Sequence, residues 1–256
     1  MIGAIAGDII GSVYERYPIK TTDFPLFQPA CTFTDDTVLT VATADAILNQ
    51  LDYAAAYKEY GQLYPHAGYG GTFIRWIFAA ESRPYNSWGN GSAMRVSPAG
   101  WAFDTVEKVL AEAEKSAAVT HNHPEGIKGA QATALAVFLA RTGQGKETIK
   151  AEIESHFGYD LSPTLDEIRP GYSFDVSCQG SVPQAIIAFL EADDVEVAIR
   201  NAISLGGDSD TLACIAGGIA HAYFGELSDL IVDETCRRLP DEFLTVMDQF
   251  NERYGC

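Results

Sequence analysis

The sequence predicts an all-α fold in which about ten or more helices form a single compact orthogonal bundle. Three observations support this prediction. Apolar residues recur with helical spacing along most of the 256-residue chain, strand-like alternation is nearly absent, and loops rich in Gly, Pro and Asn separate the helical runs. Because neither an internal repeat nor a long Pro/Gly/Ser linker divides the chain, we expect one domain over residues 1–256.

The helices are expected where apolar positions repeat about every 3.6 residues. In order, they span roughly 2–14, 36–50, 52–63, 70–81, 104–118, 126–142, 145–156, 183–192, 194–205, 211–224, 226–238 and 240–253. Many begin at residues that cap helix N-termini, namely Thr34 to Asp36, Asp104, Ser181 before Pro183, Asp193 or Asp194, Asp208 to Asp210, and Pro240 with Asp241. The stretch YSFDVSCQG (172–180) is the one short candidate for a strand, and its composition favours a loop.

Composition and charge narrow the class of protein. Hydrophobic residues make up 47% and charged residues 20% of the chain, as in ordinary globular proteins. The formal net charge of −18 argues against binding to nucleic acid or anionic membranes, because both need a basic surface. The five cysteines (31, 178, 214, 236 and 256) are scattered and lack a CxxC motif, which favours reduced thiols in the cytoplasm. The first residues, MIGAIAGDIIGS, lack a basic leader and contain Asp8, so we expect neither a signal peptide nor a membrane span.

The first predicted helix carries two stripes of special composition. Gly3, Gly7 and Gly11 recur every four residues, although glycine costs about 1 kcal/mol per helical position. This stripe predicts that another helix approaches closely. The second stripe is polar and consists of Asp8, Ser12 and Glu15. It is either a solvated face or, because most of the remaining circumference is apolar, a face directed at a functional site.

Two clusters of side-chain oxygens stand directly before apolar helical runs, FTDDT at 33–37 and GGDSDT at 206–211. Helix capping explains one oxygen in each cluster, but each offers two carboxylates and a threonine hydroxyl. If the clusters meet in space, four carboxylates repel one another unless they are protonated or bridged by cations. Hard oxygen ligands suit Mg²⁺, Mn²⁺ or Ca²⁺, and two cations about 3.5–4 Å apart are a common arrangement.

Three further features have more than one interpretation. The glycines of GNG (89–91) can adopt φ > 0 and present successive N–H groups to a phosphate, or they can form a plain turn. His121 and His123 form an H-x-H pair with no Cys or third His nearby, so a ligand-contacting or structural role is expected rather than zinc binding. Arg95 can neutralise charge after the GNG loop or pair with a core carboxylate.

The chain resembles the ADP-ribosylglycohydrolase family. The resemblance rests on five motifs in family order, GDIIGSVYE (7–15), FTDDT (33–37), SWGNGSAMR (87–95), THNHPEG (120–126) and GGDSDT (206–211). It implies an all-α fold and a dinuclear metal centre that usually holds Mg²⁺ and sometimes Mn²⁺.

The resemblance also implies roles for individual residues. The implied metal ligands are Thr34, Asp35, Asp36, Asp208, Asp210 and Thr211. The implied contacts to the diphosphate and ribose of ADP-ribose are Ser87, Trp88, Gly89, Asn90, Gly91 and Ser92, with His121 close to the ligand. Glu15 corresponds to a glutamate on a mobile flap over the metals. We expect Asp35 or Asp36 to act as the catalytic base, and Glu15 is the alternative.

The expected reaction is hydrolysis of the glycosidic bond at C1″ of an ADP-ribosyl group on a protein side chain or related conjugate. Nucleic acid is expected only as an ADP-ribosylated substrate, and no membrane partner is expected. Two alternatives remain. DSDT (208–211) superficially matches the nucleophile loop of a phosphatase, although the preceding residues have helical rather than strand spacing. A catalytically silent binding protein, crystallin-like or immunity-like, is the other. The sequence indicates neither the linkage cleaved (arginine, serine, nucleobase or small molecule) nor the oligomeric state.

Overall fold

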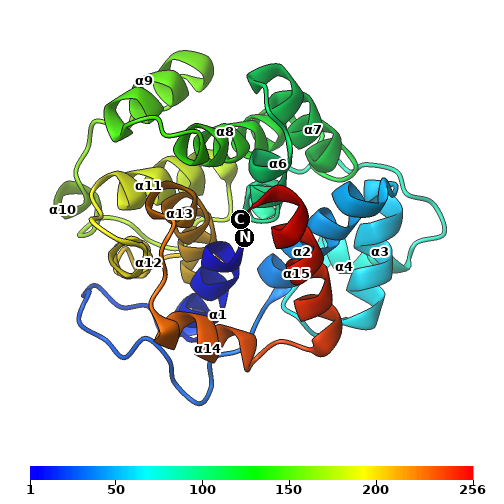
Figure 1. Cartoon of the computed structure of the whole chain (residues 1–256), viewed down its shortest axis with the longest axis horizontal. Helices are drawn as coiled ribbons and strands as arrows, with labels where there is room; N and C mark the ends of the chain where they lie inside the picture. The colour runs from blue at the N-terminus through cyan, green and yellow to red at the C-terminus, as the bar shows by residue number, and fades with distance from the viewer. Residues whose placement is uncertain (256) are drawn as a thin grey trace.

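The computed structural model describes residues 1–255. This part of the chain contains fifteen α-helices, joined by loops, and no strand (Figure 1). The helices are α1 Ile2–Arg16, α2 Asp35–Asn49, α3 Tyr53–Leu63, α4 Gly71–Phe78, α5 Gly91–Met94, α6 Ser97–Ala102, α7 Val106–Ala118, α8 Pro124–Arg141, α9 Lys146–Phe157, α10 Leu165–Ile168, α11 Cys178–Leu190, α12 Val195–Ile203, α13 Ser209–Phe224, α14 Asp229–Cys236 and α15 Asp241–Tyr254. The all-α prediction is confirmed. Figure 1 shows α1 and α13 side by side near the centre, with α2 to α4 and α15 on one side, α11 and α12 on the other, and α8 across the top.

The predicted helices differ from the observed ones in three places. The short helices α5, α6 and α10 were not expected, because four to six residues are too few to show a helical period. Helix α11 begins at Cys178 and not at 183, since Ser177 caps it by accepting from the Gly180 N–H at 3.0 Å. Pro183 therefore lies inside the helix. The cap of α7 is Thr105, one residue after the predicted Asp104.

The glycine stripe of α1 packs against α13, as its spacing predicts. A Cβ atom added to Gly3, Gly7 or Gly11 would lie closer than 3.0 Å to a backbone atom of α13. The two backbones are therefore nearly in contact along the full length of the stripe. This packing brings the N-terminal end of α13, which begins at Ser209, beside the polar residues of α1.

The hydrophobic core extends over most of the fold. One buried cluster includes residues from Met1 to Phe250, and a smaller one joins α2, α3 and α4 around Tyr57 and Trp76. This arrangement agrees with one domain over 1–256, which stays a prediction. The described cysteines are free thiols, and Cys256 lies outside the described residues. None of the helices in residues 1–255 has the length and apolar character needed to cross a membrane.

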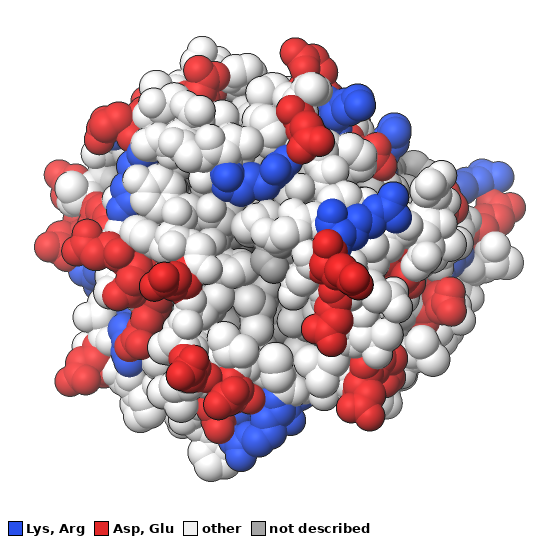
Figure 2. Space-filling model, in the orientation of Figure 1, with Lys and Arg blue, Asp and Glu red and all other residues white. Residues whose placement is uncertain are grey.

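Acidic side chains are spread over the face of the molecule drawn in Figure 2, with Lys and Arg scattered between them. No continuous basic patch of described residues is visible on this face.

Candidate metal centre and ligand cleft

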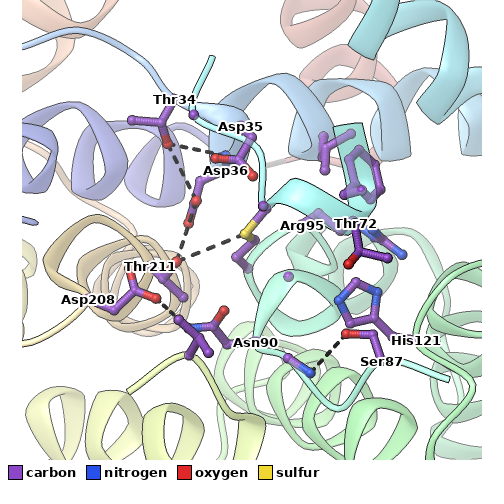
Figure 3. Close-up of a pocket in the computed structure, with 18 of the residues that line it drawn as sticks. Thr34, Asp35, Asp36, Thr72, Ser87, Asn90, Arg95, His121, Asp208 and Thr211 are labelled. Atoms are coloured by element: carbon purple, nitrogen blue, oxygen red, sulfur yellow. Dashed lines mark hydrogen bonds between the residues drawn. The ribbon is translucent and has the colours of Figure 1, made fainter. Parts of the chain in front are cut away.

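A cleft of about 570 Å³ opens between the first turns of α2, α4 and α13. One end is acidic and is lined by Glu15, Asp35, Asp36, Asp208 and Asp210, together with the hydroxyls of Thr34 and Thr211. The walls are glycine-rich and are formed by Gly68, Gly70–Phe73 and Tyr85–Gly91. In Figure 3, Thr34, Asp36 and Thr211 lie along one side of the cleft, and Ser87, Arg95 and His121 lie along the other.

The two predicted oxygen clusters meet at the acidic end of this cleft. Carboxylate oxygens of Asp8, Asp36 and Asp210 lie within 4.8 Å of one another, as do those of Glu15, Asp208 and Asp210. The Thr211 hydroxyl is 3.5 Å from Asp36 Oδ2, which joins α13 to α2 directly (Figure 3). The structure thus brings all six predicted metal ligands into one place.

Asp8 is the main residue of this centre that the sequence reasoning did not select as a ligand. It is fully buried and accepts hydrogen bonds from the N–H and hydroxyl of Thr34 (2.9 and 2.6 Å) and of Thr37 (3.1 and 2.5 Å). These four bonds hold the start of α2 against α1. The polar stripe of α1 is therefore directed at the site through Asp8 and Glu15, whereas Ser12 bonds to backbone groups of Ile9 and Thr32. In the sequence, the feature that pointed to a role for Asp8 was its position in the polar stripe of the first helix.

Helix capping accounts for only part of each cluster. Thr34 does cap α2, because its hydroxyl accepts from the Asp36 N–H at 3.3 Å. Asp208 occupies the N-cap position of α13 but makes no capping hydrogen bond. Its Oδ2 accepts from Asn90 Nδ2 at 2.7 Å instead. Capping therefore does not explain the carboxylates of Asp35, Asp36 and Asp210.

The electrostatics of the centre fit a hard cation. Burial, followed by repulsion from neighbouring carboxylates, raises the pKa of Asp35, Asp36 and Asp210 well above the ordinary value. None of these groups forms an ion pair with Lys or Arg in residues 1–255. Asp36 Oδ1 is buried without a hydrogen-bond partner among the described residues, and the neighbouring Cys214 thiol donates to the Met94 carbonyl. A divalent cation with oxygen ligands would satisfy these groups.

The turn before Asp208 is held by a lysine from the loop that follows α1. Lys20 Nζ donates to the carbonyls of Arg169 (2.8 Å), Tyr172 (2.6 Å) and Leu205. Gly206, with φ 66°, then turns the chain toward the acidic centre, a conformation that favours glycine. Lys20 thus ties the loop that follows Glu15 to the loop that carries Asp208.

Replacing Lys20 with Met is expected to lower the free energy of unfolding by about 1–2 kcal/mol, because three carbonyls lose a charged donor and regain water only in part. The variant should also gain less thermal stability from Mg²⁺, since the Asp208 loop is released. Lys58→Met is the matched control, because Lys58 Nζ donates to the carbonyls of Ala79 and Glu81 away from the cleft. Thermal unfolding with and without Mg²⁺ checks this prediction. An unchanged Mg²⁺ response in Lys20→Met would contradict the positioning role.

The GNG loop (89–91) lines the cleft, but its glycines do not adopt the positive φ angles that would present successive N–H groups to a phosphate. Neither Gly89 nor Gly91 has a positive φ, so that expectation is wrong. The Gly89 N–H already donates to Ser87 Oγ at 3.1 Å, and the Asn90 N–H donates to the Val176 carbonyl at 2.8 Å. The lack of a side chain at Gly91 lets the loop pack closely against His121, since a Cβ on Gly91 would lie 3.1 Å from His121 Nε2.

The other predicted ligand contacts divide into cleft and core residues. Ser87, Trp88, Gly89, Asn90, Gly91 and His121 line the cleft. Ser92 does not, because its buried hydroxyl donates to the Gly126 carbonyl at 2.7 Å. Ser92 is therefore a core residue, and the prediction that it contacts the ligand is wrong.

The second glycine-rich wall of the cleft consists of Gly68 and residues 70–73. It includes the N-terminus of α4, whose N-cap Gly70 has no side chain to accept from the first-turn N–H groups. The residues of this first turn line the cleft, and unpaired N–H groups at a helix N-terminus suit a ligand with anionic oxygens. The signal in the sequence was YGGT before the apolar run that begins at Phe73.

The structure decides between the alternative roles of His123 and Arg95. His123 caps α8, because its Nδ1 accepts from the Glu125 N–H at 3.1 Å. Arg95 is fully buried and forms no ion pair with a carboxylate in residues 1–255, so the core-carboxylate alternative is wrong. Its guanidinium lies 4.2 Å from the centre of the Tyr57 ring.

The fold and the site together define a class of protein. It is an all-α domain in which acidic residues at the N-termini of two helices line one end of a ligand cleft. A model of the ADP-ribosylglycohydrolase family matches residues 1–253. Human ADP-ribosylhydrolase ARH3 is 27% identical over 88% of this chain and 84% of its own length. ADP-ribosylarginine hydrolase Tri1 of Pseudomonas putida (strain GB-1) is 25% identical over 88% of this chain and 69% of its own. A solved structure of an ADP-ribosylglycohydrolase-related protein complex superposes with a TM-score of 0.73 at 24% identity, covering 99% of this chain and 97% of that chain.

The chain belongs to the ADP-ribosylglycohydrolase family. It is a glycosidic-bond hydrolase, as the family and the named relatives support. The phosphatase alternative is wrong, because the residues before DSDT form helix α12 (Val195–Ile203) and not the buried strand that such a nucleophile loop follows.

Proposed function

We propose that this protein hydrolyses the glycosidic bond at C1″ of an ADP-ribosyl group and releases ADP-ribose from a modified protein side chain or a related conjugate. The observation that carries the proposal is the convergence of α1, α2 and α13 carboxylates at one end of a cleft with glycine-rich walls. The acidic end suits the hydroxyl groups of a ribose with cations between them, and the walls suit a diphosphate.

Two Mg²⁺ ions, with Mn²⁺ as the alternative, are the proposed cofactors. Their proposed ligands are Thr34, Asp35, Asp36, Asp208, Asp210 and Thr211. Asp36 Oδ1, which is buried without a hydrogen-bond partner among residues 1–255, supports this assignment. When bound, such cations neutralise the carboxylates and polarise a water molecule. Asp8 has a positioning role, because its hydrogen bonds to Thr34 and Thr37 hold the start of α2.

The proposed catalytic base is Asp35. Its carboxylate lines the cleft and accepts no hydrogen bond from another residue in the described chain. It can therefore accept the proton of the attacking water, whereas Asp36, which also lines the cleft, already accepts hydrogen bonds from the Thr34 and Thr211 hydroxyls. Glu15, which is exposed at the same end of the cleft, is the alternative. The transition state has oxocarbenium character, so these negative charges also stabilise it.

The catalytically silent alternative, a protein that only binds ADP-ribose or a partner, is not favoured. Every carboxylate of the centre is present, and the cleft beside them is open to a ligand. The proposed partners are ADP-ribosylated proteins or small ADP-ribosyl conjugates in the cytoplasm. The similarity to the ADP-ribosylhydrolase ARH3 and the ADP-ribosylarginine hydrolase Tri1 supports this class of substrate.

The test is the release of ADP-ribose from arginine-, serine- and nucleobase-linked substrates, each with Mg²⁺, with EDTA and with Asp208→Asn. We expect release from at least one linkage, and its loss both with EDTA and in the variant. No release from any substrate, together with calorimetry that detects neither Mg²⁺ nor ADP-ribose binding, would leave the silent binding protein as the better description.

A further inference from the structure

Arg95 is a buried cation that lines the ligand cleft without a carboxylate partner. Its Nη2 donates to the Ser116 carbonyl at 2.9 Å and to Thr120 Oγ1 at 3.0 Å. Its Nε and Nη1 are buried without a hydrogen-bond partner among residues 1–255. A buried guanidinium stays charged and carries a desolvation penalty, so its retention beside the cleft needs a reason beyond packing on Tyr57.

A chain of hydrogen bonds leads from Arg95 to His121, and its direction follows from the donor groups. Arginine only donates, so Thr120 Oγ1 is the acceptor of the bond from Nη2. The hydroxyl proton of Thr120 then goes to its one other partner, His121 Nδ1 at 2.7 Å. Nδ1 is therefore an acceptor. The opposite direction would leave the Thr120 hydroxyl proton buried without an acceptor, which is costly.

The other ring nitrogen of His121 faces the cleft. A Cβ atom on Gly91 would lie 3.1 Å from Nε2 and one on Gly89 would lie 3.6 Å from it, so Nε2 abuts the GNG loop. Nε2 makes no hydrogen bond to another residue of the described chain. Burial, with the Arg95 charge as a second cause, keeps the pKa of His121 well below its usual value. The imidazole is thus neutral and carries one proton.

We propose that Arg95 and Thr120 form a positioning pair, which holds His121 in the tautomer with its proton on Nε2 and so aims a neutral N–H donor into the ligand cleft. The ligand atom that accepts this proton is an electron-rich oxygen, either of the diphosphate or of the distal ribose. The ligand part of this inference rests on the proposed function. The tautomer itself is a property of the free protein.

The first test is nitrogen NMR of the free protein, in which protonated and unprotonated imidazole nitrogens have distinct chemical shifts. The chain has only five histidines, so a His121→Gln spectrum assigns the His121 signals. We expect a protonated Nε2 and an unprotonated, hydrogen-bonded Nδ1. Thr120→Val removes the hydroxyl and should produce a population with the proton on Nδ1, whereas Thr120→Ser should retain the original tautomer. A proton on Nδ1 in the unaltered protein would overturn the proposal.

The second test is calorimetric binding of ADP-ribose and of ADP in the presence of Mg²⁺. Thr120→Val should weaken binding about fivefold, the effect of losing one hydrogen bond, and Thr120→Ser should restore it. A loss for both ligands places the acceptor oxygen on the diphosphate, and a loss for ADP-ribose alone places it on the distal ribose.

The matched control is Thr133→Val, because the buried Thr133 hydroxyl has no hydrogen-bond partner in the described chain and lies outside the cleft. It should change neither the tautomer nor the affinity. A shifted tautomer in Thr120→Val with unchanged affinity for both ligands would overturn the donor role of His121. If the unaltered protein binds neither ligand, the proposed function fails, and the NMR result still decides the tautomer.

Discussion

Replacing Asp36 with Asn is expected to reduce ADP-ribose release at least about a hundredfold and, at the same time, to raise the melting temperature of the metal-free protein. Activity falls because the variant loses a carboxylate that a divalent cation needs. Stability rises because one charge is removed from a buried group of like charges that no Lys or Arg of the described chain neutralises. A gain in stability with a loss of function is typical of a strained functional site.

The repulsion between these buried carboxylates also makes the stability of the metal-free protein depend on pH. Burial and like charges raise the pKa of Asp35, Asp36 and Asp210 in the folded protein above the ordinary value of 3.8. Without metal, the folded state therefore binds more protons than the unfolded state. Its stability is greatest below pH 3.8 as far as these groups are concerned, and is lost as pH rises through the raised values. Bound Mg²⁺ should offset this loss, so the stabilisation by Mg²⁺ should increase with pH.

Thermal unfolding at pH 5 and pH 8, with EDTA or with Mg²⁺, measures both effects together. Asp45→Asn is the control, because Asp45 lies on the same helix, does not line the cleft and accepts from the Tyr60 hydroxyl at 3.0 Å. It should keep the full Mg²⁺ response. If Asp36→Asn lowers the melting temperature in EDTA and still responds to Mg²⁺, the acidic cluster is a structural network and the metal assignment is wrong.

Gly7→Ala is expected to destabilise the protein by roughly 2 kcal/mol or more, although alanine is the better helix former. The gain in helix propensity is about 1 kcal/mol, whereas overpacking typically costs about 1–3 kcal/mol and more where backbone must move. The added methyl group would lie closer than 3.0 Å to the Ala213 carbonyl of α13, which cannot rotate away. The melting temperature should fall by roughly 5 °C.

The same substitution should also disturb the metal centre. Asp8 follows Gly7, and its bonds to Thr34 and Thr37 depend on the distance between α1 and α2. Denaturant unfolding and the Mg²⁺-induced shift in melting temperature measure the two effects. Gly171→Ala is the control, since a Cβ at Gly171 meets nothing within 4 Å and the position is not part of the cleft. If Gly7→Ala proves as stable as the unaltered protein, the close packing of α1 on α13 is not essential.

The helical fold was predictable because its signals are local. Apolar spacing within one helix and a capping residue at its start depend on neighbouring residues alone. The same signals fail for α5 (Gly91–Met94) and α10 (Leu165–Ile168), which are too short to have a period. They also fail for α11, where Pro183 suggested a start that Ser177 provides six residues earlier.

The candidate site was predictable only as a set of residue types. The sequence determined that two oxygen clusters begin helices, that glycines line one face of α1, and that the motifs resemble one family. Only the tertiary structure decided that Asp36 meets Thr211, 175 residues later, that Asp8 supports Thr34 from 26 residues earlier, and that Ser92 belongs to the core. The physical reason is that side-chain hydrogen bonds and charge repulsion act through space at a few ångströms, so packing between distant helices sets them.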